Sequence, residues 1–298
     1  MPRGLFIGRS TVDALYWLEA MPEENTKAYA RQFRTAAGGP ALNAAVTHAL
    51  LGGETALVSA VGSGPWAALV RAEMEDRGIR LLDLAEGTEY ETPLTAVLVN
   101  GANGNRTIVN PPVQAVELPR LGAWERESQK LKGAAPAVVL ADGFFLEESL
   151  ELLASLRQHG AAICLDGGSW KPGTEELAGL LTVAICSERF MLPGAESGPE
   201  ATMAWFVARG VPHVAVTRGG EPIWGWERGH RFAIEIGRIA AVDTLGAGDV
   251  LHGAFCFFFA QGLGFEASLR QAAEIATLSC QSLGTQAWVK ERKKKAIF

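Results

Sequence analysis

Cysteine is scarce in this sequence, and the few thiols are widely separated. The chain of 298 residues has four cysteines, none in a C-x-x-C pair, so neither a disulfide framework nor a cysteine-based metal cluster is expected. Long apolar runs are absent too, because no stretch approaches the ~18 consecutive apolar residues that a membrane span requires. The first residues lack the apolar core and cleavage site of a secretory signal. These absences predict a soluble, cytoplasmic protein with reduced thiols.

An excess of positive charge is also lacking. Lys and Arg number 27 against 33 Asp and Glu, a formal net charge of −6, and the one basic run, residues 290–295, lies at the C-terminus. We therefore expect no nucleic-acid partner. The five histidines are scattered without the spacing of metal ligands. No G-x-x-x-x-G-K-[ST] segment occurs, so a phosphate site in this chain is not of the P-loop type.

What the sequence does contain is a recurring order of helix, glycine and apolar strand. Residues 41–62, 150–168 and 203–220 each begin as an amphipathic helix, pass through glycine and continue as a nearly unbroken apolar strand. Such strands, alternating with helices, predict a doubly wound α/β fold with a mainly parallel sheet flanked by helices. No linker divides the chain, so we expect one domain over residues 1–298, with ligands bound at the carboxyl ends of the strands.

Two segments break this alternation and predict a small β-strand lid. Residues 90–110, YETPLTAVLVNGANGNRTIVN, have the pattern of two strands joined by a Gly/Asn-rich turn, and another strand-like stretch runs through about residues 13–34. Together they predict an antiparallel flap over one edge of the sheet, formed by about residues 14–34 and 88–110. A later hairpin is expected over residues 221–236.

The segment DTLGAGD, residues 243–249, puts an acidic side chain directly after a glycine-rich turn. The apolar residues that follow predict a buried helix, and the main-chain N–H groups at a helix N-terminus lack intrahelical partners and attract anions. Because Gly246, Ala247 and Gly248 are small, these groups can stabilise a transferring phosphoryl group while Asp249 accepts a proton from a hydroxyl. For these residues taken alone, an ordinary helix cap in an ordinary turn is the alternative.

The longer stretch DTLGAGDVLHGAF, residues 243–255, resembles the C-terminal signature of the ribokinase-like carbohydrate kinases, the PfkB family. Within this family, the motif is most similar to that of the ketohexokinase-like and sulfofructose-kinase-like branches. The resemblance implies that Asp249 is the catalytic base and that the small residues before it form the anion hole. It also implies that Asp243 and Thr244 line the phosphate site.

The resemblance continues in the N-terminal half, where AAGGPALNAAVTHALLGG is similar to the family's glycine motif. It implies that Gly38 and Gly39 let the backbone approach a sugar and that Asn43 bonds the sugar hydroxyls. This chemistry suits an amide, which offers both donors and an acceptor. Asp13 stands at the position of the family's substrate-binding acid. Arg106, on the predicted flap, is a further candidate contact for an anionic or polyhydroxyl acceptor.

Two strand ends are similar to the nucleotide side of the family's site. VTRGG implies that Thr217, Gly219 and Gly220 approach the phosphates of ATP. LDGGSWKP puts Asp166 and Lys171 at positions that lie near the phosphates in related kinases. The resemblance therefore implies ATP as the second substrate.

The sequence departs from the family where many members carry a metal-positioning Asn-x-x-Glu motif. In ICSERF, Ser187 and Phe190 occupy those places and Glu188 is left as a partial substitute. We therefore assign no direct protein ligand to a metal. Mg²⁺ is expected to arrive bound to ATP, held mainly by phosphates and water.

A rival enzyme class is raised by residues 62–83, which match the loose dinucleotide pattern G-x-G-x-x-A with Asp83 as the ribose-binding acid. This would be an NAD-dependent oxidoreductase. The unit is not N-terminal, however, and Pro65 is explained as a residue that starts a helix.

The sequence thus predicts an ATP-dependent kinase that transfers the γ-phosphoryl group to a hydroxyl of a sugar or sugar derivative. A nucleoside kinase of the same fold is the alternative, and a non-catalytic sugar- or nucleotide-binding regulator is a third possibility. The presence of Asp249 favours turnover over regulation. By resemblance, a homodimer through the flap is expected.

Overall fold

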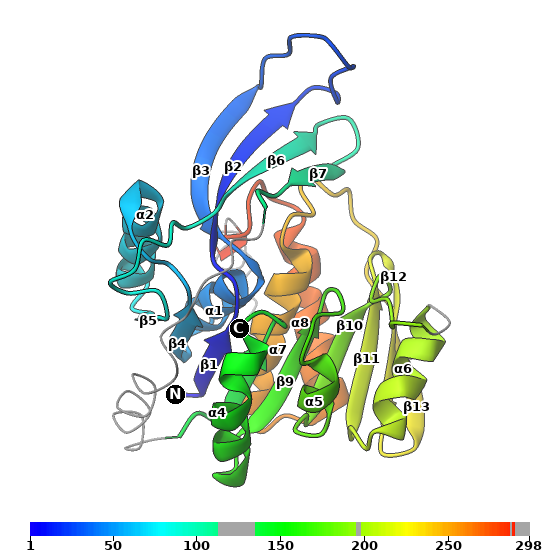
Figure 1. Ribbon diagram of the computed structural model, residues 1–298. Helices are drawn as coiled ribbons and strands as arrows, with labels where there is room; N and C mark the ends of the chain where they lie inside the picture. The colour runs from blue at the N-terminus through cyan, green and yellow to red at the C-terminus, as the bar shows by residue number, and fades with distance from the viewer. Residues whose placement is uncertain (113–134, 195–197, 287, 290–298) are drawn as a thin grey trace.

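The computed structural model describes residues 1–112, 135–194, 198–286 and 288–289, and within them a nine-stranded sheet forms the centre of the molecule (Figure 1). Its parallel part consists, in spatial order, of β5 (Arg80–Asp83), β4 (Glu54–Ser59), β1 (Arg3–Ile7), β8 (Val138–Ala141), β9 (Ala162–Gly167), β10 (Val183–Ser187) and β11 (His213–Arg218). The antiparallel strands β12 (Glu221–Glu227) and β13 (His230–Ile234) complete one edge, which confirms the hairpin expected there.

Helices cover both faces of this sheet (Figure 1). On one face lie α1 (Pro40–Leu50), α2 (Gly64–Asp76), α7 (Ala247–Ala260) and α8 (Phe265–Ser279); on the other lie α4 (Leu146–Gln158), α5 (Thr174–Ala178) and α6 (Pro199–Ala208). In β1, Phe6 packs into the first of these two cores and its neighbours Leu5 and Ile7 into the second. The predicted doubly wound, mainly parallel architecture is therefore confirmed. No helix in the described ranges is long and apolar enough to cross a bilayer.

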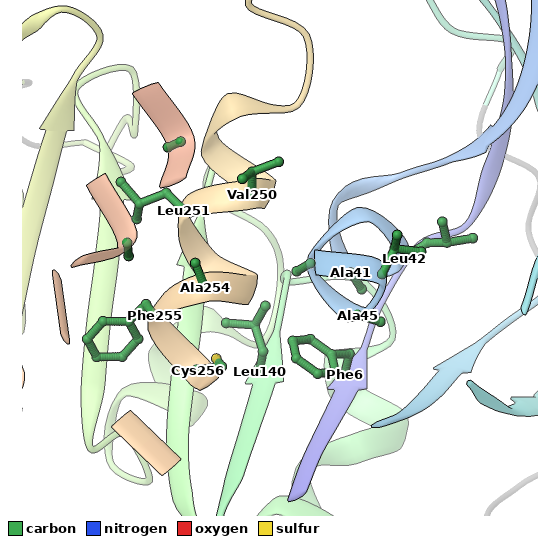
Figure 2. Close-up of a cluster of buried hydrophobic side chains, with 14 of the residues drawn as sticks. Phe6, Ala41, Leu42, Ala45, Leu140, Val250, Leu251, Ala254, Phe255 and Cys256 are labelled. Atoms are coloured by element: carbon green, nitrogen blue, oxygen red, sulfur yellow. The ribbon is translucent and has the colours of Figure 1, made fainter. Parts of the chain in front are cut away.

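Small residues let α1 and α7 approach each other closely. A Cβ atom at Gly253 of α7 would lie 2.2 Å from the carbonyl oxygen of Ala44 in α1, so only glycine fits there. Figure 2 shows this part of the core, where Ala41 and Ala45 of α1 lie near Phe6 of the sheet, and Ala254 of α7 lies near Leu140. This packing brings the start of α1 next to the first turn of α7.

A second sheet stands above the carboxyl edge of the large one (Figure 1). Its strand order is β3 (Gln32–Gly38), β2 (Thr11–Leu18), β6 (Leu94–Asn100) and β7 (Arg106–Val109). The flap expected from the sequence is present, but its description as antiparallel is wrong in one pairing, since β2 and β6 run parallel. The reason is topological: a long crossover through α1 and α2 separates β6 from the first two strands, and such a connection permits parallel pairing.

The two faces of this small sheet differ in character. Leu15, Trp17, Val97 and Val99 form a buried cluster with Leu245, which immediately precedes the turn before α7. Because alternate residues on a strand share a face and paired residues lie opposite each other, this inner face also carries polar side chains: Asp13, Arg34, Thr95 and Arg106. The outer face carries Tyr16 and Phe33, whose rings are 4.8 Å apart and which are 37% and 56% exposed.

His48, at the end of α1, makes the stability of the fold sensitive to pH. Its ring is fully buried between Phe6 and Phe257, and this burial lowers its pKa from 6.5 to about 4. Between pH 6.5 and about pH 4, His48 therefore binds a proton in the unfolded chain but not in the folded protein. We expect the free energy of unfolding to fall by about 3 kcal/mol as the pH drops through this window. Urea titrations of the parent protein and His48→Gln at pH 7 and pH 4.5 measure this, and an equal pH dependence in both would contradict it.

Candidate active site

Asp249 lies in the first turn of α7 and touches α1. Its Oδ2 atom accepts a hydrogen bond of 2.8 Å from Nδ2 of Asn43, although the two residues are 206 positions apart in the sequence. Asn43 is buried, and its Oδ1 atom has no hydrogen-bond partner among the described residues. The structure thus brings together two of the predicted site residues and leaves one buried amide oxygen without a hydrogen-bond partner in the described ranges.

The surroundings of Asp249 favour its protonated form more than water does. Burial raises its pKa to about 7, and the negative charge of Asp166 acts in the same direction. The hydrogen bond from Asn43 and the charges of His252 and Arg106 act in the opposite direction. A carboxylate that titrates near neutrality is well suited to take a proton from a hydroxyl group.

The turn before Asp249 opens toward the space above the helix. Gly246 is the residue before the first helical position, with a left-handed φ of 66°, and no side chain of the described residues caps α7. The amide of Ala247 makes one long bond, of 3.4 Å, to the carbonyl of Thr244. At Gly248 no described heavy atom lies within 4 Å of the place where a Cβ would stand. This end of α7 therefore presents main-chain N–H groups and open space, as an anion site requires.

The glycine motif before α1 is shaped by Asp13 and by the end of β1. A Cβ at Gly38 would lie 2.2 Å from Oδ2 of Asp13, and one at Gly39, whose φ is 103°, would lie 2.3 Å from the carbonyl oxygen of Arg9. Asp13 itself accepts a 2.9 Å hydrogen bond from Oγ1 of Thr11, and burial raises its pKa. The packing of the protein therefore requires glycine at position 39, and at position 38 a larger residue would displace the carboxylate of Asp13.

Asp142, at the carboxyl end of β8, was missed by the sequence reasoning. Its carboxylate accepts main-chain hydrogen bonds from Arg9 at 2.9 Å, Ala41 at 3.2 Å and Phe144 at 3.0 Å. Burial raises its pKa to about 6. It joins the end of β1 to the start of α1 and so supports the glycine motif. The available signal was an acidic residue directly after the apolar strand AVVLA.

Asp243 and Thr244, predicted together at the phosphate site, lie in different surroundings. The buried carboxylate of Asp243 accepts bonds of 2.9 Å from the amides of Leu245 and Gly284, so it clamps two loops together instead of facing open space. A direct contact from this carboxylate to phosphate is therefore not supported. Thr244 accepts a 2.7 Å bond from Nη1 of Arg106, which links the small sheet to the turn before α7.

The residues predicted on the nucleotide side gather at the ends of β10 and β11. The amide of Glu188 donates to the carbonyl of Thr217 at 2.9 Å, so these two predicted positions are neighbours. Glu188, Gly219 and Gly220 are exposed, and a Cβ at either glycine would meet no described atom within 4 Å. Phe190, in contrast, is buried in the core. Its ring packs against Trp170, and Trp170 in turn packs against Trp205.

Lys171 lies apart from this group. Its Nζ atom is 3.2 Å from Oγ of Ser169 and 4.6 Å from the ring centre of Phe144, so it covers the loop after β8. No contact joins it to the turn before α7 within the parts of the chain that are described. Among those parts there is also no cluster of three His, Cys, Asp or Glu side chains that could hold a metal.

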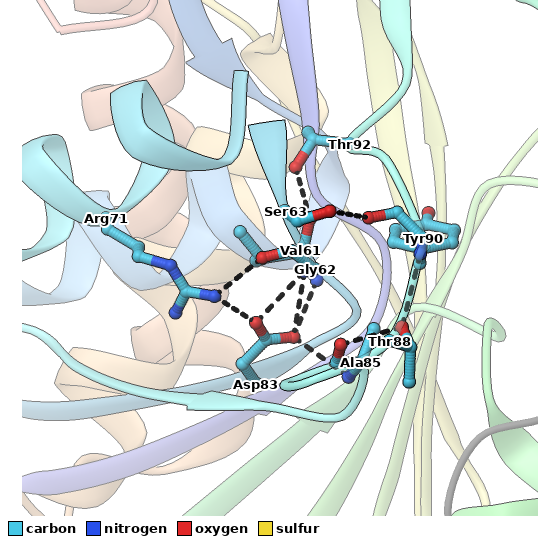
Figure 3. Close-up of polar contacts among 9 residues, drawn as sticks. All are labelled: Val61, Gly62, Ser63, Arg71, Asp83, Ala85, Thr88, Tyr90 and Thr92. Carbon is cyan, nitrogen blue, oxygen red and sulfur yellow. Dashed lines mark hydrogen bonds and ion pairs between the residues drawn. The ribbon is translucent and has the colours of Figure 1, made fainter. Parts of the chain in front are cut away.

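Asp83, the acid of the rival dinucleotide pattern, is used within the protein (Figure 3). Its carboxylate accepts hydrogen bonds from the amides of Val61, Gly62 and Ala85 and pairs with Arg71. With its side chain only 3% exposed, it is not available to a ribose. Asp83 therefore binds the glycine loop of residues 62–64 instead of a ribose, and the oxidoreductase interpretation has no support.

Comparison with known proteins agrees with this geometry. Ketohexokinase of Mus musculus is 24% identical over 298 residues, covering 93% of this chain and 95% of the relative. Among solved structures, ribokinase from Giardia lamblia has a TM-score of 0.82 at 16% identity and covers 99% of both chains. Arabidopsis thaliana ribokinase, solved with ribose and ATP, has a TM-score of 0.75 at 21% identity and covers 100% of this chain and 99% of its own. The profile described as pfkB family carbohydrate kinase matches residues 5–292, and the chain therefore belongs to this family of carbohydrate kinases.

Proposed function

We propose that this carbohydrate kinase transfers the γ-phosphoryl group of ATP to a hydroxyl of a sugar or sugar derivative. The observation that carries the proposal is Asp249, bonded to Asn43 and placed at the open, uncapped end of α7. The Arabidopsis relative was solved with ribose and ATP, which supports both substrate classes. A nucleoside kinase is not favoured by the comparisons, since mouse ketohexokinase matches over nearly the whole chain.

In this mechanism the acceptor hydroxyl lies between Asp249 and the first turn of α7. Asp249 accepts the hydroxyl proton as the oxygen attacks the γ-phosphorus, and the amides around Gly246, Ala247 and Gly248 stabilise the charge on the phosphoryl oxygens. The free Oδ1 atom of Asn43 accepts a hydrogen bond from a second hydroxyl of the sugar. These residues hold the acceptor in line for transfer.

The small sheet supplies the rest of the acceptor site and acts as a lid. Asp13 and Arg106 share its inner face, and Arg106 already contacts Thr244 beside the anion hole. Gly38 and Gly39 let the main chain come close to the sugar ring. Closure of this sheet over the acceptor excludes water and so limits hydrolysis of ATP.

Mg²⁺ enters as part of the Mg–ATP substrate. Bound to ATP, the metal would keep several of its waters and would need few protein ligands. Glu188, Thr217, Gly219 and Gly220 lie together at the strand ends where the nucleotide is expected. We propose that Glu188 contacts the hydrated metal through water.

The proposed function is tested by ADP release with Mg–ATP across a panel of neutral sugars, acidic sugars, phosphorylated sugars and nucleosides. We expect turnover of at least one sugar with kcat/KM well above that of every nucleoside. Turnover restricted to nucleosides would replace the proposal with its alternative. No turnover of any acceptor, with sugar binding intact, would favour a regulator.

The acid limb of the rate profile reports on Asp249. Because burial raises the pKa of this base to about 7, kcat/KM for the sugar is expected to fall as the pH drops below 7. With a catalytic carboxylate of unperturbed pKa, kcat/KM would stay constant down to about pH 4. Removing the hydrogen bond in Asn43→Ala is expected to move the limb to higher pH. Profiles from pH 5 to 9, with ATP saturating and Mg²⁺ in excess, measure this, and a flat profile down to pH 5 would contradict it.

We also propose that two copies of the chain associate through the outer faces of their small sheets. This face presents the exposed side chains of Tyr16, Phe33, Leu94 and Val109, and Met21 and Tyr29 are exposed on the loop that joins β2 to β3. Apolar patches of this kind commonly mark protein contacts. Light scattering is expected to show a dimer for the parent protein and a monomer for Phe33→Asp, whereas the mutation Phe144→Asp, outside the patch, should leave the mass unchanged. A monomeric parent protein would contradict the proposal.

The state of the cysteines supports a cytoplasmic location. Cys164, Cys186, Cys256 and Cys280 are all free thiols, and the first three are buried. Free thiols persist in reducing compartments, so we propose that the enzyme acts in the cytoplasm.

A further inference from the structure

His252 lies one turn after Asp249 on α7 and is almost completely buried. Its Nδ1 atom is 2.8 Å from the carbonyl oxygen of Gly248, and its Nε2 atom is 3.1 Å from the carbonyl oxygen of Ile185 in β10. Oδ2 of Asp166, at the end of β9, lies 3.5 Å from the same Nδ1 atom. The side chains of His252 and Asp166 are only 6% and 8% exposed, so this group is sealed beneath the active site.

Both ring nitrogens of His252 face oxygen atoms that can only accept hydrogen bonds. A neutral imidazole has one donor and one acceptor nitrogen, so one of the two contacts would then bring two lone pairs together. The imidazolium ion donates from both nitrogens and satisfies both carbonyls. Its positive charge would be costly in this buried place without an anion, and Asp166 supplies one. Oδ2 of Asp166 has no hydrogen-bond partner in the described ranges, so the positive charge of the imidazolium is what offsets the buried negative charge of Asp166.

The contact with Gly248 has a direct consequence for the anion hole. The carbonyl of Gly248 and the N–H of Asp249 belong to one planar peptide group and point in opposite directions. The helix directs this carbonyl toward its body, the Nδ1 atom of His252 gives it an additional side-chain partner, and the N–H of Asp249 therefore faces the open end of α7. A mobile peptide here would lose this aim, and preorganised donors are what stabilise charge in transfer.

We propose that His252, held as an imidazolium by Asp166 and by the carbonyl oxygens of Gly248 and Ile185, is a positioning residue for phosphoryl transfer. It fixes the peptide between Gly248 and Asp249, and it offsets the negative charge of Asp166 beneath the catalytic base. The inference rests on the proposed kinase function and adds to it a buried pair of side chains beneath the catalytic base.

The balance of charge around the base supports this role. The charged groups that act on Asp249 are Asp166 from β9, His252 from α7 and Arg106 from β7. Asp166 raises the pKa of Asp249 and His252 lowers it, so the two effects oppose each other. The buried thiols of Cys186 and Cys256 also lie in the field of Asp166, and burial together with this charge raises the pKa of each, so they stay neutral. With both charges present, the pKa of Asp249 is expected to stay near 7. With the charge of Asp166 alone, it would be higher.

A double-mutant cycle tests the proposal through the acid limb of kcat/KM. In His252→Gln the charge of Asp166 is no longer offset, so the limb should move up by about one pH unit, and kcat at pH 7 should fall about tenfold or more. In Asp166→Asn the limb should move down by a similar amount. The double variant removes both charges and should return the limb to within about half a unit of the parent's. KM for sugar and for ATP should change less than about threefold throughout.

His48→Gln is the matched control, because it replaces another buried histidine between α1 and the sheet that has no contact with Asp249. It should lower the melting temperature without moving the limb. If His252→Gln loses activity equally at every pH without moving the limb, and Asp166→Asn does not move it either, His252 is only a packing residue and the proposal is wrong. Should His252→Gln fail to fold, an unmoved limb in Asp166→Asn overturns the proposal by itself. Failure of the kinase function would instead appear as an inactive parent protein.

Discussion

Replacing Asp249 with Asn is expected to lower kcat by about 10³-fold while sugar binding stays measurable. The amide keeps the size of the side chain and a polar partner for Asn43, but it cannot accept a proton from the attacking hydroxyl. Positioned general bases commonly contribute between 10² and 10⁴ in rate. The measurement is the rate of ADP release at saturating substrates, together with calorimetric titration of the sugar.

Asp76→Asn is a suitable control, since this acid lies on α2 with its side chain 82% exposed. It should retain the kcat of the parent protein. A kcat in Asp249→Asn within about threefold of the parent's would remove Asp249 from the role of base. Loss of sugar binding alone, with kcat preserved, would make it a binding residue instead.

The Gly248→Ala variant is expected to be as stable as the parent protein and about 100-fold less active. No described atom lies within 4 Å of the added methyl group, and alanine is at least as compatible with a helix as glycine. The methyl would occupy the space above the first turn, where the phosphoryl oxygens must reach the main-chain amides. Loss of a single donor in such a site commonly costs 10² to 10³ in rate. Thermal unfolding and steady-state kinetics in ATP measure the two effects.

Gly246→Ala provides the contrasting case. Its φ of 66° is unfavourable for alanine, and the methyl would lie 2.6 Å from Cγ2 of Thr285, so stability and activity should both fall. If Gly248→Ala instead turns over ATP at the parent rate, the space above the turn is not used by phosphate. The anion hole would then have to be sought elsewhere.

Local patterns were sufficient for much of this architecture. The order of glycine-ended helices and apolar strands indicated a parallel sheet because such strands must be buried on both faces. The segment from Asp243 to Asp249 likewise indicated a helix start, because an acid after a glycine-rich turn and the apolar run that follows are local properties. Resemblance of this segment to the PfkB signature added the function, which the family match confirmed.

Other features depended on contacts that have no local signature. The parallel pairing of β2 with β6 contradicts an expectation drawn from neighbouring residues, and the inward turn of Asp243 modifies another. Asp83 shows the same limit, because its distance from the glycine loop suggested a ribose contact while its hydrogen bonds lie within the protein.

The sequence by itself determined the sheet, the small-residue turn and the presence of an acid after it, because periodicity and backbone freedom are encoded residue by residue. Only the tertiary structure decided which groups surround that acid. Asn43 reaches it from α1, Asp166 from β9 and Arg106 from β7, and the close packing of α1 on α7 sets the distance of Asn43. The chemical character of Asp249 follows from burial and from charges brought near it by folding, and these vary with distance in space and not with separation along the chain.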